Sequence, residues 1–282
     1  MQEYRIFFLY SNDNKIDFNR FKKSVDEFIK NNGLPPLKSQ MNDIRVLYGS
    51  DEYWKIKKLS DDSQKYGIKI VEHTYEVHYN KSEISNAMFF ELKLGIFGRE
   101  DYTKSFSTEY TDFYCESCDT HQYIPKNDVY INKTEFRGKD IATSMNCNNE
   151  IIVSNKMKKL IEEAKLTGVE FYSAHHYNNR IKNDYSAWHM SVTSIMPPID
   201  KSMPVFIIEN YCHLCKKHHI LPLSYVRYKH EELEKSSDFN LSCETFGPGW
   251  YGSPKLIISR NVFDLIKQNK IKGCRFEIVG SV

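Results

Sequence analysis

The chain has 282 residues, of which 40% are hydrophobic and 14% aromatic, and it carries 39 Lys and Arg residues against 37 Asp and Glu. A chain of this length buries roughly three quarters of the surface that it exposes when unfolded, which argues against a disordered, collagen-like or coiled-coil protein. The net charge of +2 provides no broad positive field, which disfavours a sequence-independent nucleic-acid binder.

The first hundred residues combine strand-like and helical patterns. An apolar run at residues 6–10 predicts a first strand. Apolar residues then recur at helical spacing and predict a helix near residues 17–31, which ends at Asn32-Gly33. We therefore expect an N-terminal α+β region over residues 1–105.

Further strands are expected in the second part of this region. Residues 68–80 alternate between apolar and polar side chains, which is strand periodicity. His73 and His78 differ by an odd number, so a strand places them on opposite faces and they do not form a joint metal site. Apolar and aromatic stretches at 88–97 and 106–114 predict two more strands.

The cysteine content indicates the cellular compartment. The chain has seven cysteines, an odd number, and four of them form two Cys-x-x-Cys pairs. In a chain of this size that pattern favours a reducing compartment and metal ligation over a disulfide scaffold. No run of about 18 apolar residues occurs, so we expect no transmembrane helix and a cytosolic protein.

From Cys115 onward the sequence repeats itself, with an offset that grows from 97 to 98 and then to 105 after a Gly/Pro-rich insertion. The clearest matches are Cys115, Cys118, His121 and Pro125 with Cys212, Cys215, His218 and Pro222; Asp140 with Asp238; and Ser154, Leu160, Ile161, Gly168 and Phe171 with Ser259, Leu265, Ile266, Gly273 and Phe276. We place the first copy at residues 106–195 and the second at 196–282.

Each copy ends in the same unit, which consists of an apolar run, a serine, a helix, a glycine and a second apolar run. Ser154 and Ser259 are natural N-caps, because a serine hydroxyl accepts a hydrogen bond from a free amide of the first helical turn. Gly168 and Gly273 permit the positive-φ turn after the helix. We therefore expect an α+β fold with mixed or antiparallel sheets and an internally duplicated CxxC-plus-β-helix-β unit.

The two Cys-x-x-Cys turns are the strongest candidate site, with ligands Cys115, Cys118, Cys212 and Cys215. Two such turns supply the four sulfurs of a closed tetrahedral Zn²⁺ site, and closed sites are structural because no position is open for water. Such a zinc ion would join the two copies. Free thiols, a redox dithiol, or a mixed site that recruits His121 or His218 remain alternatives.

Other reactive residues are interpreted as structural. Three cysteines have no Cys-x-x-Cys partner and are expected to be buried or partly buried: Cys147, Cys243 and Cys274. His175-His176 and His189 are expected in a polar, aromatic connection between the copies, for which a catalytic or binding loop is the alternative interpretation. Because no nucleophile is spaced recognisably to these histidines, we do not expect an enzyme.

Residues 110–282 resemble the double-CxxCG-motif proteins of bacterial polymorphic-toxin systems, which serve as immunity proteins. The resemblance rests on the two Cys-x-x-Cys pairs and on the segment Ile-Ile-Val-Ser…Leu-Ile…Thr-Gly-Val-Glu-Phe that begins at Ile151. The glycine that follows each pair in that family is replaced by Asp119 and Lys216. The resemblance implies the four paired cysteines as ligands and implies no catalytic residue.

The resemblance leads to the expected function. It implies a cytosolic immunity protein that neutralises a cognate toxin protein by direct binding, with no membrane partner. The alternative is a zinc-stabilised nucleic-acid-binding or regulatory module. This alternative predicts binding that weakens steeply with salt, whereas an inhibitor binds one protein tightly.

Overall fold

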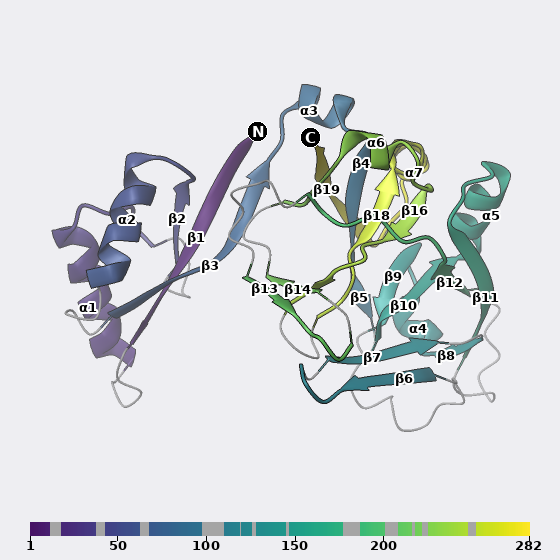
Figure 1. Cartoon of the computed structure of the whole chain (residues 1–282), viewed down its shortest axis with the longest axis horizontal. Coiled ribbons are helices and arrows are strands. Elements are labelled where there is room, and N and C mark those ends of the chain that lie inside the picture. The colour runs from purple at the N-terminus through teal and green to yellow at the C-terminus, as the bar shows by residue number, and fades with distance from the viewer. Residues whose placement is uncertain are drawn as a thin grey trace. The chain divides into compact units, whose positions relative to one another are not determined.

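The computed structural model describes residues 1–11, 18–37, 43–62, 68–97, 110–118, 120–125, 128–144, 147–176, 187–200, 208–215, 218–221, 225–247 and 252–282. The chain divides into two compact units, Met1–Asn86 and Ala87–Val282 (Figure 1). The N-terminal region is expected to extend to residue 105, whereas the first compact unit ends at Asn86. Strand β4 (Phe89–Leu94) pairs with two strands near the C-terminus and therefore belongs to the second unit.

The N-terminal unit is a three-stranded antiparallel sheet with helices. Its central strand β1 (Gln2–Ser11) pairs with β2 (Asp43–Leu47) and β3 (Ile68–His78). The helices are α1 (Phe18–Asn31), α2 (Asp51–Asp62) and α3 (Lys81–Asn86). The strands expected near 6–10 and 68–80 and the helix expected at 17–31 are confirmed, although the side chain of His73 lies outside the described residues.

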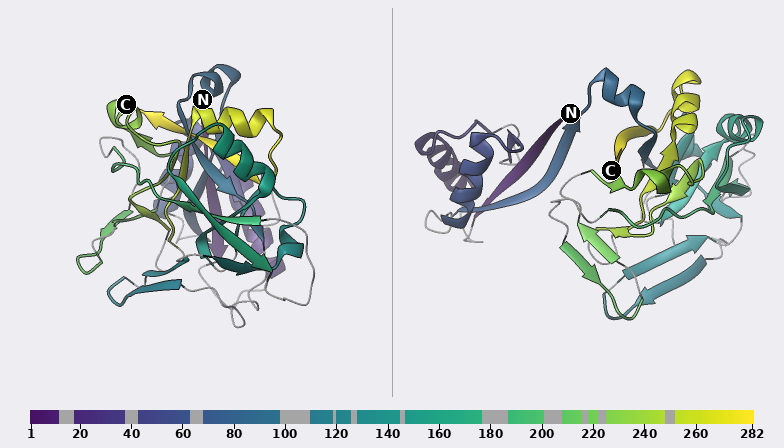
Figure 2. Two further views of the ribbon diagram at one scale, coloured as in Figure 1. Left: turned by 90° about the vertical axis from the view of Figure 1, so that its right-hand side faces the viewer. Right: turned by 45° about the horizontal axis from the view of Figure 1, so that its top comes forward.

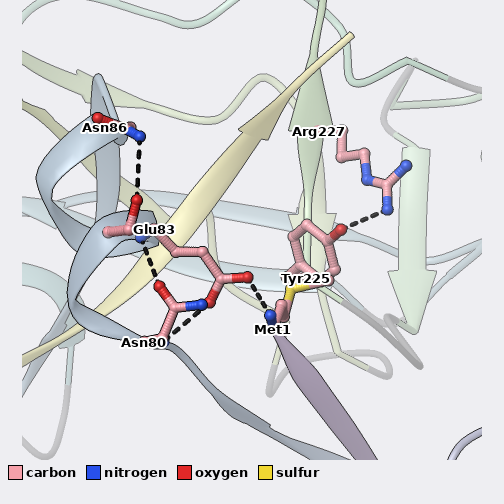
Figure 3. Close-up of polar contacts among 7 residues, drawn as sticks. Met1, Asn80, Glu83, Asn86, Tyr225 and Arg227 are labelled. Carbon is pink, nitrogen blue, oxygen red and sulfur yellow. Dashed lines mark hydrogen bonds and ion pairs between the residues drawn. The ribbon is translucent and has the colours of Figure 1, made fainter.

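Local signals fix the helix ends in this unit. Gly33 adopts φ +54°, and the Leu34 amide donates to the Ile29 carbonyl 3.0 Å away, which closes α1 where the sequence predicts. At the start of α3 the Glu83 amide donates to Asn80 Oδ1 and the Asn80 amide donates to Glu83 Oε2, both at 2.8 Å (Figure 3). This reciprocal capping box satisfies two amides that the helix itself leaves without partners.

The C-terminal unit contains two larger sheets, and its α+β class agrees with the expectation. Sheet I has the strand order β5-β9-β10-β12-β11-β8, and sheet II has the order β15-β19-β4-β18-β16. Sheet I consists of β5 (Ile96–Phe97), β8 (Val129–Ile131), β9 (Ile141–Ser144), β10 (Cys147–Ser154), β11 (Val169–His176) and β12 (Ala187–Val192). Sheet II adds to β4 the strands β15 (Arg227–Tyr228), β16 (Phe239–Leu241), β18 (Leu256–Ser259) and β19 (Cys274–Ser281).

The two sheets have corresponding strand orders and directions. In sheet I, β8 pairs parallel to β11, and β11, β12, β10 and β9 then pair antiparallel in turn. In sheet II, β15 pairs parallel to β19, and β19, β4, β18 and β16 follow antiparallel. The stretch expected as one strand at 88–97 is therefore two strands, because the chain leaves sheet II at Gly95 and enters sheet I as β5.

A β-helix-β unit occurs in each sheet, as the sequence predicts. Helix α5 (Asn155–Glu163) connects β10 with β11, and α7 (Arg260–Gln268) connects β18 with β19. Ser154 and Ser259 cap these helices by accepting from the amides of Met157 and Val262. The two helices lie side by side (Figure 2).

No helix in the described part of the chain is long and apolar enough to cross a membrane.

Two aspartates connect the β-helix-β unit of sheet I with that of sheet II. Asp140 accepts from Ser154 Oγ at 3.0 Å and from the Lys272 amide at 3.0 Å. Asp238 accepts from Ser259 Oγ at 2.6 Å and from the Thr167 amide at 3.0 Å. Asp140 therefore fixes the start of α5 in sheet I and the turn after α7 in sheet II. Asp238 fixes the start of α7 in sheet II and the turn after α5 in sheet I.

The glycines after the two helices make close backbone contacts across the same interface. Gly168 has φ +90°, and a Cβ on it would lie 2.1 Å from the carbonyl oxygen of Phe239. Gly273 has φ +107°, and its Cβ would lie 2.0 Å from the carbonyl oxygen of Ile141. Both the dihedral angle and the space require glycine at these positions, whereas the sequence pattern indicates only the dihedral angle.

Candidate metal centre

Two hairpins present the four paired cysteines. Cys115 is the last residue of β6 (Tyr110–Cys115), which pairs with β7 (Thr120–Pro125). Cys212 directly follows β13 (Ile208–Tyr211), which pairs with β14 (His218–Leu221). The second cysteine of each pair lies in the turn, and the Cys118 amide donates to the Cys115 carbonyl at 3.3 Å. The turns of the hairpins lie side by side (Figure 1).

The hairpins bring all four sulfur atoms within 4.8 Å of one another. Cys115 Sγ lies 3.5 Å from Cys212 Sγ, and Cys118 Sγ lies 3.7 Å from Cys215 Sγ. In a tetrahedral zinc–thiolate site, bonds of about 2.3 Å place the sulfurs about 3.8 Å apart. The donor set and its spacing therefore fit a tetrahedral ion that prefers thiolate ligands.

Burial and hydrogen bonds shape this centre. Cys115 and Cys212 are 2% and 6% exposed, whereas Cys118 and Cys215 are half-buried. The pKa of the Cys212 thiol is lowered to about 6, chiefly because the backbone amide of Cys215 donates to its sulfur; burial opposes this effect and a hydrogen bond from Cys115 reinforces it. Thiolates are the metal-binding form, so this environment favours metal binding.

The other candidate residues lie elsewhere. Cys243 is exposed, so its expected burial is wrong, whereas the expected partial burial of Cys274 is confirmed and burial raises its thiol pKa to about 11. The side chains of Cys147, His121 and His218 lie outside the described residues. A mixed Cys/His site therefore stays an alternative.

The histidines expected in a connecting loop lie in strands. His175 and His176 end β11, and His189 lies within β12, because these two strands form an antiparallel pair around the connection. His175 Nε2 lies 3.0 Å from Asp128 Oδ2, and this hydrogen bond lowers the pKa of the Asp128 carboxyl. Both side chains of the pair are nearly half exposed. Nothing in the sequence pattern indicates that Asp128 is the partner.

Comparison with protein-family models gives no match to this chain, and comparison with curated proteins gives none either. The four-cysteine centre is therefore the main structural guide to function.

Proposed function

We propose that this protein is an immunity protein that neutralises a cognate bacterial toxin by direct protein–protein binding, and that its cysteine centre holds one structural zinc ion. The zinc assignment is supported by the four thiols, whose spacing of 3.5 and 3.7 Å is close to a tetrahedral edge. The immunity role is supported by the sequence resemblance of residues 110–282. Four protein thiolates leave no open position on the ion, so its role is structural.

The zinc assignment is tested by metal analysis of the purified chain. We expect one zinc ion per chain, and we expect the double substitution Cys115→Ser and Cys212→Ser to abolish binding and lower the unfolding temperature. Cys243→Ser is the matched control, because that thiol is exposed and does not belong to the four-cysteine cluster. Equal metal content in the double variant and the control would contradict the assignment.

The immunity role is tested by expressing the product of the neighbouring upstream gene with and without this protein. We expect this neighbour to arrest growth, and we expect rescue together with a co-purifying complex. A harmless neighbour, or one that kills regardless, contradicts this pairing. Salt-sensitive binding to DNA or RNA would instead favour the nucleic-acid-binding alternative.

We also propose that the C-terminal unit arose by duplication and that its repeats exchange their first strands. In this proposal the repeats are 89–176 and 187–281. Strands β4 and β12 begin 98 positions apart, at Phe89 and Ala187, which is also the offset between Asp140 and Asp238. Strand β4 then lies in the sheet of the second repeat, and β12 lies in the sheet of the first.

Hydrogen exchange on the full chain tests this exchange of strands. Leu92 in β4 and Met190 in β12 are both buried, so truncating either to alanine weakens the packing around its own sheet. We expect Leu92→Ala to reduce protection chiefly in β18 and β19, and Met190→Ala to reduce it chiefly in β10 and β11. Loss of protection in the opposite sheets would refute the proposal.

A further inference from the structure

The sulfur atoms of the cysteine centre are also close enough to react with each other. The two short separations, 3.5 and 3.7 Å, each join equivalent cysteines of the two hairpins, 97 residues apart in the chain. A disulfide bond is about 2.05 Å long, so side-chain rotation and a small approach of the hairpins would bring either pair to bonding distance. The centre therefore contains two potential cross-links in addition to its metal ligands.

The hairpins are attached to parts of the unit that do not depend on a metal. Strand β14 pairs with β17 (Thr245–Phe246), and the Gly247 amide donates to the Ile220 carbonyl at 3.0 Å. On the other side, β7 lies beside β10 of sheet I. The two sheets are joined by Asp140 and Asp238 and by the strands β4 and β12. Loss of a metal ion would therefore leave the hairpins close together.

An oxidant reaches the four thiols unequally. Cys118 and Cys215 are half-buried, whereas Cys115 and Cys212 are almost fully buried. All four sulfurs are thiolates when they hold the metal, so exposure decides the order and the outer pair, Cys118 and Cys215, reacts first. Oxidation of the outer pair removes two of the four ligands, and the inner pair, Cys115 and Cys212, reacts after it.

We propose that the cysteine centre is an oxidation-sensitive site, in which hydrogen peroxide converts the four thiolates into the cross-hairpin disulfides Cys118–Cys215 and Cys115–Cys212 and releases the metal ion. This inference rests on the proposed function of the centre as a metal site. The metal-bound and the oxidised states are then two alternative ways of joining the same hairpins, and the oxidised state is covalent.

Each disulfide consumes one peroxide molecule. A thiolate attacks a peroxide oxygen, the O–O bond breaks, and the departing hydroxide takes a proton to become water, which leaves a sulfenic acid. The second thiolate attacks that sulfur, the S–O bond breaks, and the second hydroxide takes a proton and leaves as water. The sulfur pair loses two electrons and the peroxide gains two. After both pairs have reacted, no thiolate remains to hold the ion.

The test uses the full-length Cys243→Ser protein, which lacks one exposed thiol that lies outside the centre. The zinc-loaded protein is titrated with peroxide, metal release is followed with a colorimetric chelator, and the disulfides are mapped by mass spectrometry without reduction. Cleavage after Glu116 and after Leu214 separates the two cysteines of each turn, so every pairing is distinguishable.

We expect two peroxide equivalents to release one zinc ion per chain, and we expect cross-linked peptides that join Cys118 to Cys215 and Cys115 to Cys212. Dithiothreitol and added zinc should restore the starting state. In a second variant, Cys118→Ser, only the Cys115–Cys212 cross-link should form. The oxidised protein should unfold at a higher temperature than the reduced, metal-free protein.

Disulfides within the turns, Cys115–Cys118 and Cys212–Cys215, or sulfinic acids without cross-links, would overturn the inference. These outcomes in a protein that binds one zinc ion leave the zinc assignment intact. Conversely, the expected cross-links in a protein that binds no metal as purified or after zinc addition would contradict the zinc assignment and the metal-release step, and would support only the formation of the cross-hairpin disulfides.

Discussion

Replacing Gly273 with alanine tests the close approach of the two sheets most directly. An alanine Cβ at this position would lie 2.0 Å from the Ile141 carbonyl oxygen, whereas Cβ atoms in proteins stay beyond 3.0 Å from such atoms. The backbone of Ile141 must therefore retreat. Its amide and that of Asp140 both donate to the Lys272 carbonyl, at 3.1 and 2.9 Å, and the retreat breaks these bonds.

The expected loss follows from two contributions. The positive φ costs a non-glycine residue about 1–2 kcal/mol, and each lost backbone hydrogen bond costs about 1 kcal/mol. We therefore expect Gly273→Ala to lower the free energy of unfolding by about 3–4 kcal/mol. Gly138→Ala is the matched control, because Gly138 has φ +83° but nothing within 4 Å of its Cβ position, so we expect only about 1–2 kcal/mol.

The assay is urea denaturation followed by tryptophan fluorescence. A Trp54→Phe background leaves Trp188 and Trp250 as the only indoles, and both belong to the C-terminal unit, so the signal reports that unit alone. Equal losses of stability in Gly273→Ala and Gly138→Ala would refute the argument that the close approach of Gly273 to Ile141 excludes a Cβ atom.

The remaining predictions concern single side chains of the C-terminal unit. Ser259→Ala removes the N-cap of α7 and should cost about 1 kcal/mol in the same assay, and no loss would refute the capping role. Burial raises the Asp238 pKa, but hydrogen bonds from Ser259 and Thr167 lower it more, so its net value lies below 3.8. A lowered pKa stabilises the fold above the unfolded-state value, and this stabilisation is lost as pH falls through the folded-state value. Asp238→Asn should therefore lower stability at pH 7 and flatten its decline below about pH 4. His175→Ala should change stability by less than about 1 kcal/mol in the same assay, because its pairing with Asp128 is solvent-exposed; a larger loss would refute this interpretation of the pair.

Local patterns predict several elements of this protein and the members of its cysteine cluster. Helix α1 ends at Gly33 because a glycine there permits a positive φ, and Ser154 and Ser259 cap helices where the repeat places them. The repeated Cys-x-x-Cys motif predicts the four-cysteine cluster, in which each pair lies in the turn of a short hairpin. These features depend on residues close together in the chain or on a repeated motif.

The neighbours of β4 and β12 do not follow from such patterns. The two strands share no identical residue at an offset of 98, so sequence comparison alone does not pair them. Periodicity predicts that a strand exists but not which sheet receives it, because that choice depends on packing between distant segments. The same reason explains why the His175–Asp128 pair and the exposure of Cys243 were not predicted.

The position of β4 has a consequence for folding during synthesis. Lys93 of β4 pairs with Glu277 of β19, 184 residues later in the chain. At a synthesis rate of about 5–20 residues per second, β4 leaves the ribosome roughly 10–40 s before its partner is made. During that interval this apolar strand lacks the neighbours that will bury it, so the nascent chain is most exposed to aggregation then. The complete sheet II can form only when almost the whole chain has been translated.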